Sequence, residues 1–385
     1  MLGGAALRPI PMRIFQVVNV RWFNATAWYA LTLSRLLVDA GHEVTVLTQA
    51  NTDCERKARE MGLSPVSVDL NTTNPLRFAA AARYITQLLR THRPEVVNCH
   101  RGEGFFLWGL LKLSGFEFKL VRTRGDQRLP RSDPFNRWLH ASVADAVVVT
   151  NQRMSNHFLK AMRTPGKSVW LIHGGVDPNV FYFDQTGRDD VRKEFGFEEN
   201  DVVIGLLGRF DRVKGHKELI QAVALLRRET DIPIKLFLIG FDTAMTSSQI
   251  EEWLDQYNVT DITRISGKRE DVNSCISALD IGVVSSLWSE AIARAALEIM
   301  ASQHPLVSSD VGVMPDLAAP ELLTPAGDVQ ALAKAVTSVA LEAETREKVL
   351  KAQKRTMSQL THREFLKRTL SLYASLLDEN QPPKS

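Results

Sequence analysis

DVVIGLLGRFDRVKGHKELIQAVALLRRETDIPIKLFLIG, residues 201–240, carries the pattern that decides the fold. An apolar run ends in glycine, a helical pattern covers about 215–229, and a second apolar run, IKLFLIG, follows. A strand, a helix and a second strand in this order predict two parallel strands joined by a crossover helix. Apolar strands of this kind indicate a parallel sheet with helices on both faces.

The same alternation extends in both directions along the chain. Upstream, we expect strands at MRIFQVV (12–18), VTVLT (44–48), PVSVDL, EVVNCH, KLVRTR and DAVVVT, separated by a helix closed by Gly41 and by helices around 76–92, 104–114 and 134–142. Downstream, we expect strands at ITRISG, IGVVSS, PLVSS and ELLTP, with helices around 247–257, 271–278 and 328–341 and a further helix that opens near Glu290. The pattern predicts the α/β class with two consecutive doubly wound domains.

VWLIHGGVDPNVF (169–181) breaks the alternation with two glycines and a proline, so we place the domain linker there. A chain of 385 residues is also long for a single core. The predicted parts are a loose leader (1–11), an N-terminal domain (12–177), a C-terminal domain (178–345), C-terminal helices that are candidates for packing back on the N-terminal domain (346–376), and a disordered tail (377–385).

The composition is that of an ordinary globular protein, with 44% hydrophobic and 24% charged residues. No apolar run reaches the ~18 residues that a membrane-spanning helix needs. Three scattered cysteines, Cys54, Cys99 and Cys275, favour a reducing cytoplasm over a disulfide framework. We therefore expect a cytoplasmic protein.

The charge is distributed unevenly between the two halves of the chain. Residues 1–185 hold 23 basic and 14 acidic residues, and residues 186–385 hold 24 and 30. The first half is therefore expected to face something anionic, for which a membrane surface, an acidic acceptor and nucleic acid are candidates. A merely basic surface remains an alternative.

KLVRTRGDQRLPRSDPFNRWLH (119–140) is the most basic stretch, with six Lys or Arg against two Asp. Leu129, Phe135 and Trp138 are interleaved with these charges. Cations attract anionic lipid and aromatic rings suit the membrane interface. We expect a peripheral contact with the inner face of a membrane or with a phosphorylated glycolipid; an ordinary exposed loop is the alternative. No nucleic-acid-binding motif accompanies the charge, so nucleic acid is not expected as a partner.

GLLGRFDRVKGHKEL (205–219) places charged residues where a strand gives way to a helix. Ligands of doubly wound sheets bind beyond the carboxyl ends of the strands. Arg209 and Lys214 on this loop could hold a diphosphate, and Gly215 lets the backbone come close. The spacing is not that of a Walker phosphate loop. Two solvated cations on a surface loop are the alternative.

SEAIARAALEIM, from Ser289 to Met300, carries two acids eight positions apart, Glu290 and Glu298. If the whole span were helical, it would rise ~12 Å, which is about the length of a nucleotide sugar. One carboxylate could accept hydrogen bonds from the hydroxyls of a sugar and the other from a ribose, and the alanines would leave room for the ligand. A packed alanine-rich helix with two exposed acids is the alternative.

Together, the two motifs resemble the retaining glycosyltransferases of family four, whose GT-B fold has two Rossmann-like domains facing across a cleft. The resemblance implies that Arg209 and Lys214 hold the donor diphosphate, that Glu290 contacts the donor sugar and that Glu298 contacts the ribose. It also places Arg269, in GKREDV (267–272), beside the donor base, and the backbone of Ala291 and Ile292 against the donor. DVGVMPDL (310–317) resembles the Gly-Gly-x-Pro-Glu loop of the family.

The N-terminal half both follows and departs from the family pattern. His100, after PEVVNC, falls where the family often has a histidine near the reacting sugar, although a histidine at a strand end is also commonly structural. The loop after the first strand, NVRWFNATAW (19–28), lacks the glycine of the family. Arg21, Trp22 and Asn24 would then replace backbone contacts with side-chain contacts in the acceptor pocket.

The resemblance implies the transfer of a sugar from a nucleotide sugar to a hydroxyl of a glycan or glycolipid, with retention of configuration, in the synthesis of a bacterial lipopolysaccharide, O-antigen or capsule. No Asp-x-Asp occurs in the sequence, and we expect no metal or other cofactor. A nucleotide-sugar epimerase of the same fold, and a non-catalytic protein that binds nucleotides or glycans, remain alternatives.

Overall fold

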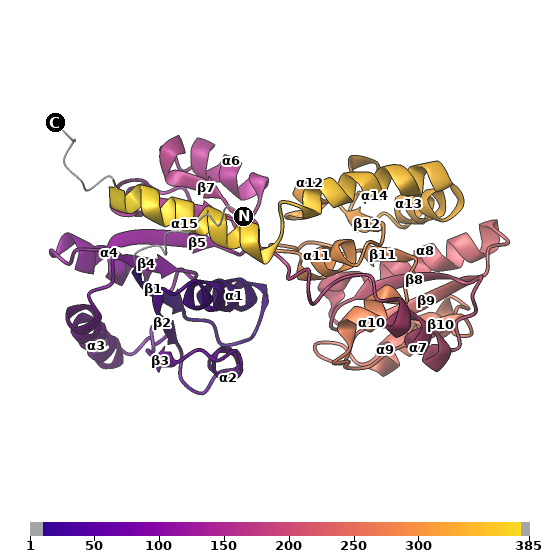
Figure 1. The fold of residues 1–385 in the computed structure, drawn as a ribbon, viewed down its shortest axis with the longest axis horizontal. Coiled ribbons are helices and arrows are strands. Elements are labelled where there is room, and N and C mark those ends of the chain that lie inside the picture. The colour runs from indigo at the N-terminus through magenta and orange to yellow at the C-terminus, as the bar shows by residue number, and fades with distance from the viewer. Residues whose placement is uncertain (1–10, 379–385) are drawn as a thin grey trace, which may run out of the picture. The chain divides into compact units, whose positions relative to one another are not determined.

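The computed structural model describes residues 11–378, so most of the predicted leader and of the predicted tail lies outside the described residues. The chain forms two compact units (Figure 1). Unit 1 runs to His173 and resumes at Phe365, and unit 2 comprises Gly174–Glu364. The chain therefore passes from unit 1 to unit 2 within the predicted linker.

Unit 1 is built on a seven-stranded parallel sheet in the order β3-β2-β1-β4-β5-β6-β7. Its strands are β1 (Arg13–Val18), β2 (Glu43–Thr48), β3 (Pro65–Ser67), β4 (Val96–Cys99), β5 (Lys119–Arg124), β6 (Ala146–Val149) and β7 (Val169–Leu171). Its helices are α1 (Ala25–Asp39), α2 (Asp53–Glu60), α3 (Pro75–His92), α4 (Phe105–Leu113), α5 (Pro134–Trp138), α6 (Gln152–Lys160) and α15 (His362–Asp378), with a π-helical turn at Leu139–Val143 and a 3-10 turn at Gly166–Ser168.

Unit 2 is built on a six-stranded parallel sheet in the order β10-β9-β8-β11-β12-β13. Its strands are β8 (Val202–Leu207), β9 (Ile234–Ile239), β10 (Thr263–Ile265), β11 (Ile281–Val284), β12 (Leu306–Ser309) and β13 (Leu323–Thr324). Its helices are α7 (Gln185–Phe195), α8 (His216–Glu229), α9 (Ser247–Gln256), α10 (Val272–Ser277), α11 (Arg294–Ala301), α12 (Met314–Leu317), α13 (Val329–Leu341) and α14 (Ala343–Met357), with 3-10 turns at Arg212–Lys214 and Pro320–Leu322. Both units are doubly wound, as the sequence predicted.

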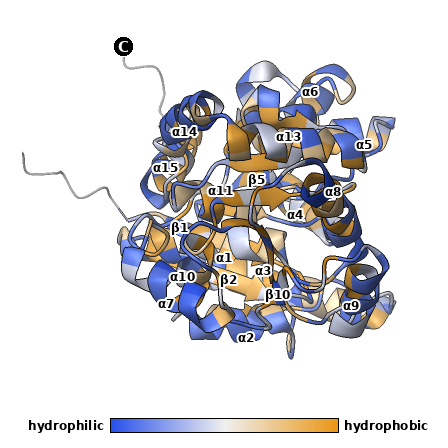
Figure 2. Ribbon diagram, turned by 90° about the vertical axis from the view of Figure 1, so that its right-hand side faces the viewer, coloured by the Kyte–Doolittle hydropathy of each residue, from blue (hydrophilic) through white to orange (hydrophobic). Residues whose placement is uncertain are grey.

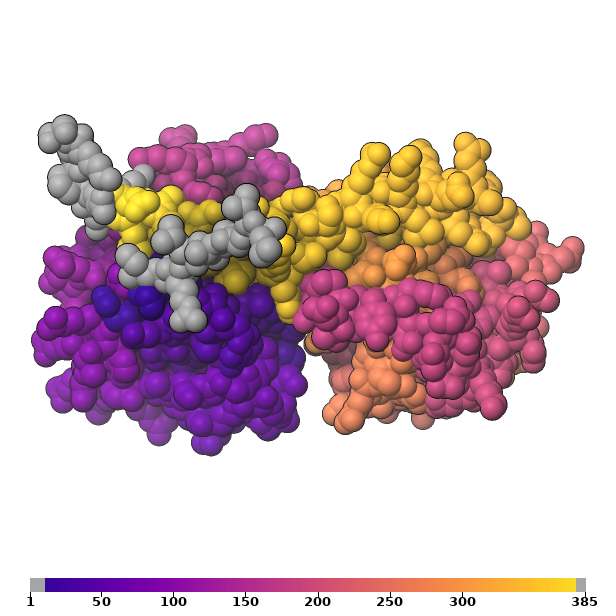
Figure 3. Space-filling view, viewed as in Figure 1, coloured from indigo at the N-terminus to yellow at the C-terminus, as the bar shows by residue number. Residues whose placement is uncertain are grey.

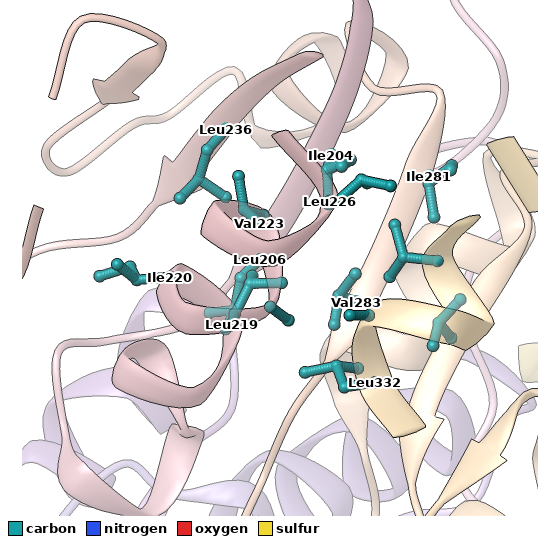
Figure 4. Packing of buried hydrophobic residues seen from close by; sticks show 14 of the residues in the cluster. Ile204, Leu206, Leu219, Ile220, Val223, Leu226, Leu236, Ile281, Val283 and Leu332 are labelled. Atoms are coloured by element: carbon teal, nitrogen blue, oxygen red, sulfur yellow. The ribbon is translucent and has the colours of Figure 1, made fainter. Parts of the chain in front are cut away.

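The core of unit 2 shows why the stretch at 201–240 decides the fold. Ile204 and Leu206 of β8 pack against Leu219 and Val223 of α8, and all four side chains are at most 2% exposed (Figure 4). Leu332 of α13 joins the same cluster. Burial of each such side chain stabilises the fold by about 1.5–3 kcal/mol, so the apolar faces of the helices fix them to the sheet.

The last helix, α15, belongs to unit 1 although it ends the chain. Its Tyr373 hydroxyl accepts hydrogen bonds from Asn98 Nδ2 (3.0 Å) and Gln16 Nε2 (3.4 Å) of the sheet. The Phe365 ring lies 4.5 Å from that of Tyr29 in α1. The yellow surface of α15 adjoins the indigo and magenta surface of unit 1 (Figure 3). Helix α14 packs instead on α11 and α13 of unit 2, so only one of the two C-terminal helices lies on unit 1.

Five elements of the structure are absent from the sequence expectations: the helices α2, α6 and α7, the four-residue helix α12, and the strand β7. The first three helices are short and polar, and their buried apolar side chains are few, for example Cys54 and Ala58 in α2. Figure 2 colours α2 and α7 mostly blue for this reason. Strand β7 has three residues and lies in the segment that we read as a linker. None of the helices in residues 11–378 combines the length and the hydropathy that a membrane-spanning segment requires.

Candidate functional site

The candidate site in unit 2 lies where the order of the strands reverses. In the sheet, β8 lies between β9, which is the next strand along the chain, and β11. The loops that leave β8 and β11 therefore diverge at the carboxyl edge of the sheet, which is where doubly wound folds bind ligands. The two motifs singled out in the sequence follow these two strands.

A close backbone approach joins the two loops. Gly215 has φ +70°, and a Cβ atom on it would lie 1.9 Å from the carbonyl oxygen of Ser285. The Ser285 hydroxyl donates to the carbonyl oxygens of Lys214 and Gly215, at 3.0 Å each. The amide of Leu287 also donates to the carbonyl of Val213 (2.8 Å). Only glycine fits this conformation and this space, so Gly215 fixes Lys214 beside the loop that follows β11.

Lys214 and Glu290 form the centre of the site. The ammonium Nζ of Lys214 donates to Oε1 of Glu290, and the Ser286 hydroxyl donates to the same oxygen (2.6 Å). The carbonyl of Glu290 accepts a hydrogen bond from the amide of Val313 (2.8 Å), which ties the acid to the segment 310–317. The side chain of Glu290 is 8% exposed and that of Lys214 is 23% exposed. A buried carboxylate held in this way has a fixed orientation.

Arg209 lies on the same loop as Lys214 and is more exposed. Its guanidinium donates to Asp211 Oδ2 through Nη2 (2.8 Å) and Nε (3.2 Å), and its side chain is 48% exposed. Asp211 in turn accepts from the amide of Val213 (3.2 Å). A guanidinium has five N–H donors, so Arg209 keeps donors for an anionic ligand while Asp211 orients it.

The segment from Glu290 to Glu298 is not one helix. Helix α11 begins at Arg294, after Ala293 in the left-handed region (φ +52°), so the expected continuous rise between the two acids is wrong. Ala291 and Ile292 lie in the turn before the helix, with Ile292 3% exposed. Ala293 and Ala296 are buried in the protein, so they leave no room for a ligand there.

Glu298 is 4% exposed, and its Oε1 accepts from Arg294 Nε (2.5 Å). Burial raises the pKa of the Glu298 carboxyl, and Arg294 opposes this effect. The exposed-acid alternative is therefore excluded for Glu298. A ribose could reach this carboxylate only if Arg294 moved aside, so its predicted contact remains a prediction.

Arg269 follows the edge strand β10 and takes part in a separate ion-pair network. It donates to Asp271 (2.8 and 2.7 Å) and to Glu194 of α7 (2.6 and 2.9 Å). These hydrogen bonds, first with Asp271 and then with Glu194, raise its pKa. The structure does not bring Arg269 into hydrogen-bond contact with Lys214 or Glu290, and its role beside the donor base remains a prediction.

His100 lies in unit 1 and is a core residue in this structure. Its side chain is fully buried, and its Nε2 donates to Gln16 Oε1 (2.7 Å). Burial lowers its pKa to about 3, with a further contribution from the charge of Arg122. The prediction that His100 contacts the sugar is not supported by this placement, because its side chain is fully buried and already hydrogen-bonded within unit 1. The structural alternative fits the geometry.

Several residues of the site were missed in the sequence. Ser285 and Ser286 fix Lys214 and Glu290, Asp211 orients Arg209, and Arg294 covers Glu298. Asp211 lies two residues from Arg209 and Arg294 lies four residues from Glu298, and in each pair the charges are opposite. This spacing of opposite charges could have identified both residues from the sequence. The serines carry no such signal, because serine is common at the ends of strands.

Comparison with known proteins agrees with this architecture. Residues 26–180 match the family described as Glycosyltransferase Family 4, and residues 187–356 match Glycosyl transferases group 1. EpsD of Bacillus subtilis is 23% identical, with 60% of this chain and 62% of EpsD covered. N-acetyl-alpha-D-glucosaminyl L-malate synthase of Bacillus anthracis is 22% identical over 45% of this chain and 44% of that protein. The chain thus spans less than two thirds of the length of either relative.

Solved structures with the same fold cover nearly the whole chain. A glycosyltransferase from Rickettsia africae superimposes with a TM-score of 0.85 at 16% identity, over 96% of this chain and all of that one. Anabaena HepE in complex with UDP gives 0.81 at 16% identity, over 94% of this chain and 100% of that one. The lipopolysaccharide outer core galactosyltransferase WaaB gives 0.72 at 15% identity, over 94% and 99%. Two Rossmann-like units and two family matches that together span most of the chain lead to one conclusion: the protein belongs to the group 1 glycosyltransferases and has the GT-B fold.

Proposed function

We propose that this protein transfers a sugar from a nucleoside-diphosphate sugar to a hydroxyl of a glycan or glycolipid, with retention of the anomeric configuration. The observation that carries the proposal is the contact of Lys214 with Glu290 at the strand-order reversal of unit 2, with Arg209 on the same loop. A cation and a fixed acid at this point match the two ends of the reacting bond, which are a diphosphate and a sugar. The solved complex of HepE with UDP supports a nucleotide donor.

The chemistry that the site offers is electrostatic. When the glycosidic bond to the diphosphate breaks, negative charge develops on the leaving phosphate oxygens. Arg209 and Lys214 would neutralise that charge, and such preorganised donors are typically worth a factor of 10²–10³ in rate each. The ammonium of Lys214 has three N–H groups, so it can keep its hydrogen bond to Glu290 while it donates to a phosphate.

Glu290 would hold the donor sugar by accepting from its hydroxyls. Its Oε1 is engaged by Lys214 and Ser286, and the carboxylate retains further acceptor capacity for a sugar hydroxyl. Glu298 would serve the ribose once Arg294 moves. No side chain is assigned as a covalent nucleophile, so we propose that the acceptor hydroxyl attacks on the face from which the diphosphate departs. The proton of the hydroxyl would then pass to an oxygen of the departing diphosphate. We expect activity to survive EDTA, because the two cations replace a metal in this scheme.

The experiment is incubation of the purified protein with a panel of UDP-, GDP- and ADP-sugars, with and without glycan acceptors. Transfer, or slow hydrolysis of one donor, is the expected result, and NMR of the product should show the anomeric configuration of the donor. A sugar that changes configuration while still attached to its nucleotide would identify an epimerase. Binding without turnover would favour the non-catalytic alternative. Failure of every nucleotide sugar to bind would refute the proposal.

Synthesis of a bacterial cell-envelope polysaccharide is the setting that we propose, on the basis of WaaB, a lipopolysaccharide outer core galactosyltransferase of the same fold. An acceptor of this kind is attached to lipid, which makes a membrane surface a second partner. The structure changes the extent of the predicted basic surface at 119–140. Residues Lys119–Arg124 form β5 between β4 and β6, and Arg122 is 1% exposed, so this part cannot face a membrane.

Exposed rings nearby support a smaller membrane contact in unit 1. Phe106 of α4 lies 5.2 Å from Phe135 of α5, and Phe135 lies 5.8 Å from Trp138, between ring centroids. The three side chains are 40–49% exposed. Arg128 and Arg131, just before α5, are exposed as well. We propose that these rings enter the interface of an anionic membrane to which the arginines are attracted.

Flotation with lipid vesicles tests this contact. The protein should float with vesicles that contain phosphatidylglycerol and remain below with vesicles of phosphatidylcholine alone. A Phe135→Ser, Trp138→Ser double variant should lose flotation, whereas Leu76→Ser, at an 80% exposed apolar residue of α3, should not. Equal flotation of the double variant and the control would refute the membrane contact.

A further inference from the structure

A cavity in unit 1 lies at the strand-order reversal of the sheet of that unit. Its volume is about 570 Å³, and its walls come from the loop after β1, the cap of α1, the segment after β3 and the loop after β4. Strand β1 pairs with β2 on one side and β4 on the other, so the loops after β1 and β4 diverge here. This position in the sheet of unit 1 is equivalent in topology to the position of the proposed donor site in unit 2. The proposed function requires an acceptor but does not say to which chemical class the acceptor belongs.

One residue that lines this cavity carries a polar side chain without a hydrogen-bond partner among the described residues. Asn19 is 2% exposed and lines the cavity, and neither its Oδ1 nor its Nδ2 has a hydrogen-bond partner in the described part of the chain. A buried amide without partners costs about 1–3 kcal/mol for each group left unsatisfied. The side-chain amide of Asn19 has one acceptor oxygen and two donor N–H groups. Hydroxyl groups of a ligand could form hydrogen bonds with all of them.

Two arginines line the same cavity. Arg101 is held by Glu103, which also lines the cavity, through Nε (3.1 Å) and Nη2 (2.7 Å). Its remaining N–H groups are left for a ligand. Arg21 is exposed at the wall and makes no hydrogen bond or ion pair among residues 11–378. The charged walls thus carry two cations and one anion, and helix α1, with its positive amino end, begins directly after the wall residue Asn24.

A third cation lies beneath the loop that carries Arg101. Arg122 is 1% exposed and donates through Nη1 to the carbonyl of Cys99 (2.9 Å), while its Nε and Nη2 have no partner among the described residues. A Cβ atom on Gly102 would lie 3.9 Å from Nη2. Burial, and then the charge of Arg124, lower the pKa of Arg122 to about 9, so it remains protonated at neutral pH. A buried cation without a carboxylate partner is costly, and it adds positive potential under the cavity.

The exposed ring of Trp22 completes the cavity. It stands in the wall and is 68% exposed. An aromatic face beside hydrogen-bonding groups suits the apolar face of a sugar ring. We propose that this cavity binds an acceptor whose sugar carries an anionic group, a phosphate or a carboxylate: Arg21 and Arg101 hold the anion, Asn19 binds hydroxyls and Trp22 packs on the sugar ring. This proposal adds the chemical class of the acceptor to the proposed transfer reaction. It rests on the proposed function only in that the bound ligand is taken to be the acceptor of that reaction.

The test is binding to the full-length protein without any donor, measured by saturation-transfer NMR and titration calorimetry. The probes are matched sets of methyl glycosides of glucose, galactose, mannose and N-acetylglucosamine: neutral, 6-phosphorylated and, for the hexoses, oxidised to the uronic acid. At least one anionic member should bind roughly 10-fold or more tightly than its neutral counterpart, which is the effect of one charge-assisted hydrogen bond or two. The phosphate and carboxylate arms tell which anion is recognised.

Three variants separate the roles in the cavity. Arg21→Ala should remove the preference for the anion, Arg21→Lys should restore part of it, and Trp22→Ala should weaken the neutral and anionic ligands alike. Arg83→Ala, at an exposed arginine of α3 outside the cavity, is the matched control and should change neither. Equal binding of neutral and anionic sugars, absence of binding by every anionic probe at 10 mM, or an unchanged preference in Arg21→Ala would each overturn the proposal.

Because these measurements need no nucleotide sugar, they are independent of transfer. If no donor is turned over but the anion preference and its loss in Arg21→Ala are observed, the proposed function fails and the anionic ligand stands. If transfer occurs to neutral acceptors and no preference is measured, the proposed function stands and this inference fails.

Discussion

Replacement of Gly215 by alanine perturbs the point that joins the two loops of the proposed donor site. Two costs add at this position. The φ of +70° is strained for an alanine, which costs about 1 kcal/mol. The new methyl would lie 1.9 Å from the carbonyl oxygen of Ser285, so the backbone has to shift, at a cost of about 1–3 kcal/mol. We expect a loss of about 2–4 kcal/mol in the free energy of unfolding of unit 2.

Two further glycines in unit 2 separate these costs. Gly196 has φ +67° with nothing within 4 Å of its added Cβ, so Gly196→Ala should lose only the ~1 kcal/mol of backbone strain. The nearest neighbour of a Cβ on Gly208 is 3.6 Å away, an ordinary contact, and its φ is not in the left-handed region. Gly208→Ala should therefore leave stability unchanged or raise it by up to ~1 kcal/mol.

Urea unfolding followed by tryptophan fluorescence measures the three variants, and donor turnover measures the consequence for the site. A shift of Gly215 displaces Lys214 from Glu290, and a displacement of 1 Å can cost about 10²-fold in rate. The reasoning is refuted if Gly215→Ala is no less stable than Gly196→Ala, because the backbone approach to Ser285 would then cost nothing.

Three further predictions concern single side chains. The pKa of buried His100 is lowered to about 3, so its contribution to the free energy of unfolding is complete above about pH 6.5 and is lost as the pH falls towards 3. Relative to neutral pH, this histidine should therefore lower the free energy of unfolding by about 2 kcal/mol at pH 5. His100→Gln should remove that loss, which the pH dependence of urea midpoints would show. Tyr373→Phe leaves the buried amide of Asn98 without its acceptor and should cost about 1–3 kcal/mol, whereas Tyr84→Phe, at a 41% exposed residue, should be neutral by the same assay. Glu290→Gln keeps the shape of the side chain and removes its charge, and kcat with the preferred donor should fall at least 10-fold with a smaller change in nucleotide affinity; an unchanged kcat would remove the acid from the reaction.

The architecture could be read from the sequence because parallel strands are buried on both faces and leave continuous apolar runs. The expected strand at 12–18 and the expected helix at 215–229 each begin one residue before β1 (Arg13–Val18) and α8 (His216–Glu229), and each ends where the observed element ends. The short polar helices α2, α6 and α7 could not be read in this way, since each is held by only a few apolar contacts that a periodic pattern does not reveal.

The candidate site could be predicted only as a set of residues. The sequence places Lys214 and Glu290 after two strands, and the strand order brings them into contact. It could not predict that Ala293 would enter the left-handed region and delay α11, because alanine favours a helix at that position. Nor could it predict the burial of His100, which depends on α15 and on residues far along the chain.

The most direct test of the central claim is the kcat/KM of Lys214→Ala for the preferred nucleotide sugar. The exposed Lys334 of α13 provides the matched control, Lys334→Ala. If Lys214 neutralises the leaving diphosphate, its replacement should lower kcat/KM by about 10²-fold or more, and the control should stay within twofold of the original protein. Equal values of kcat/KM for Lys214→Ala and Lys334→Ala would contradict the account.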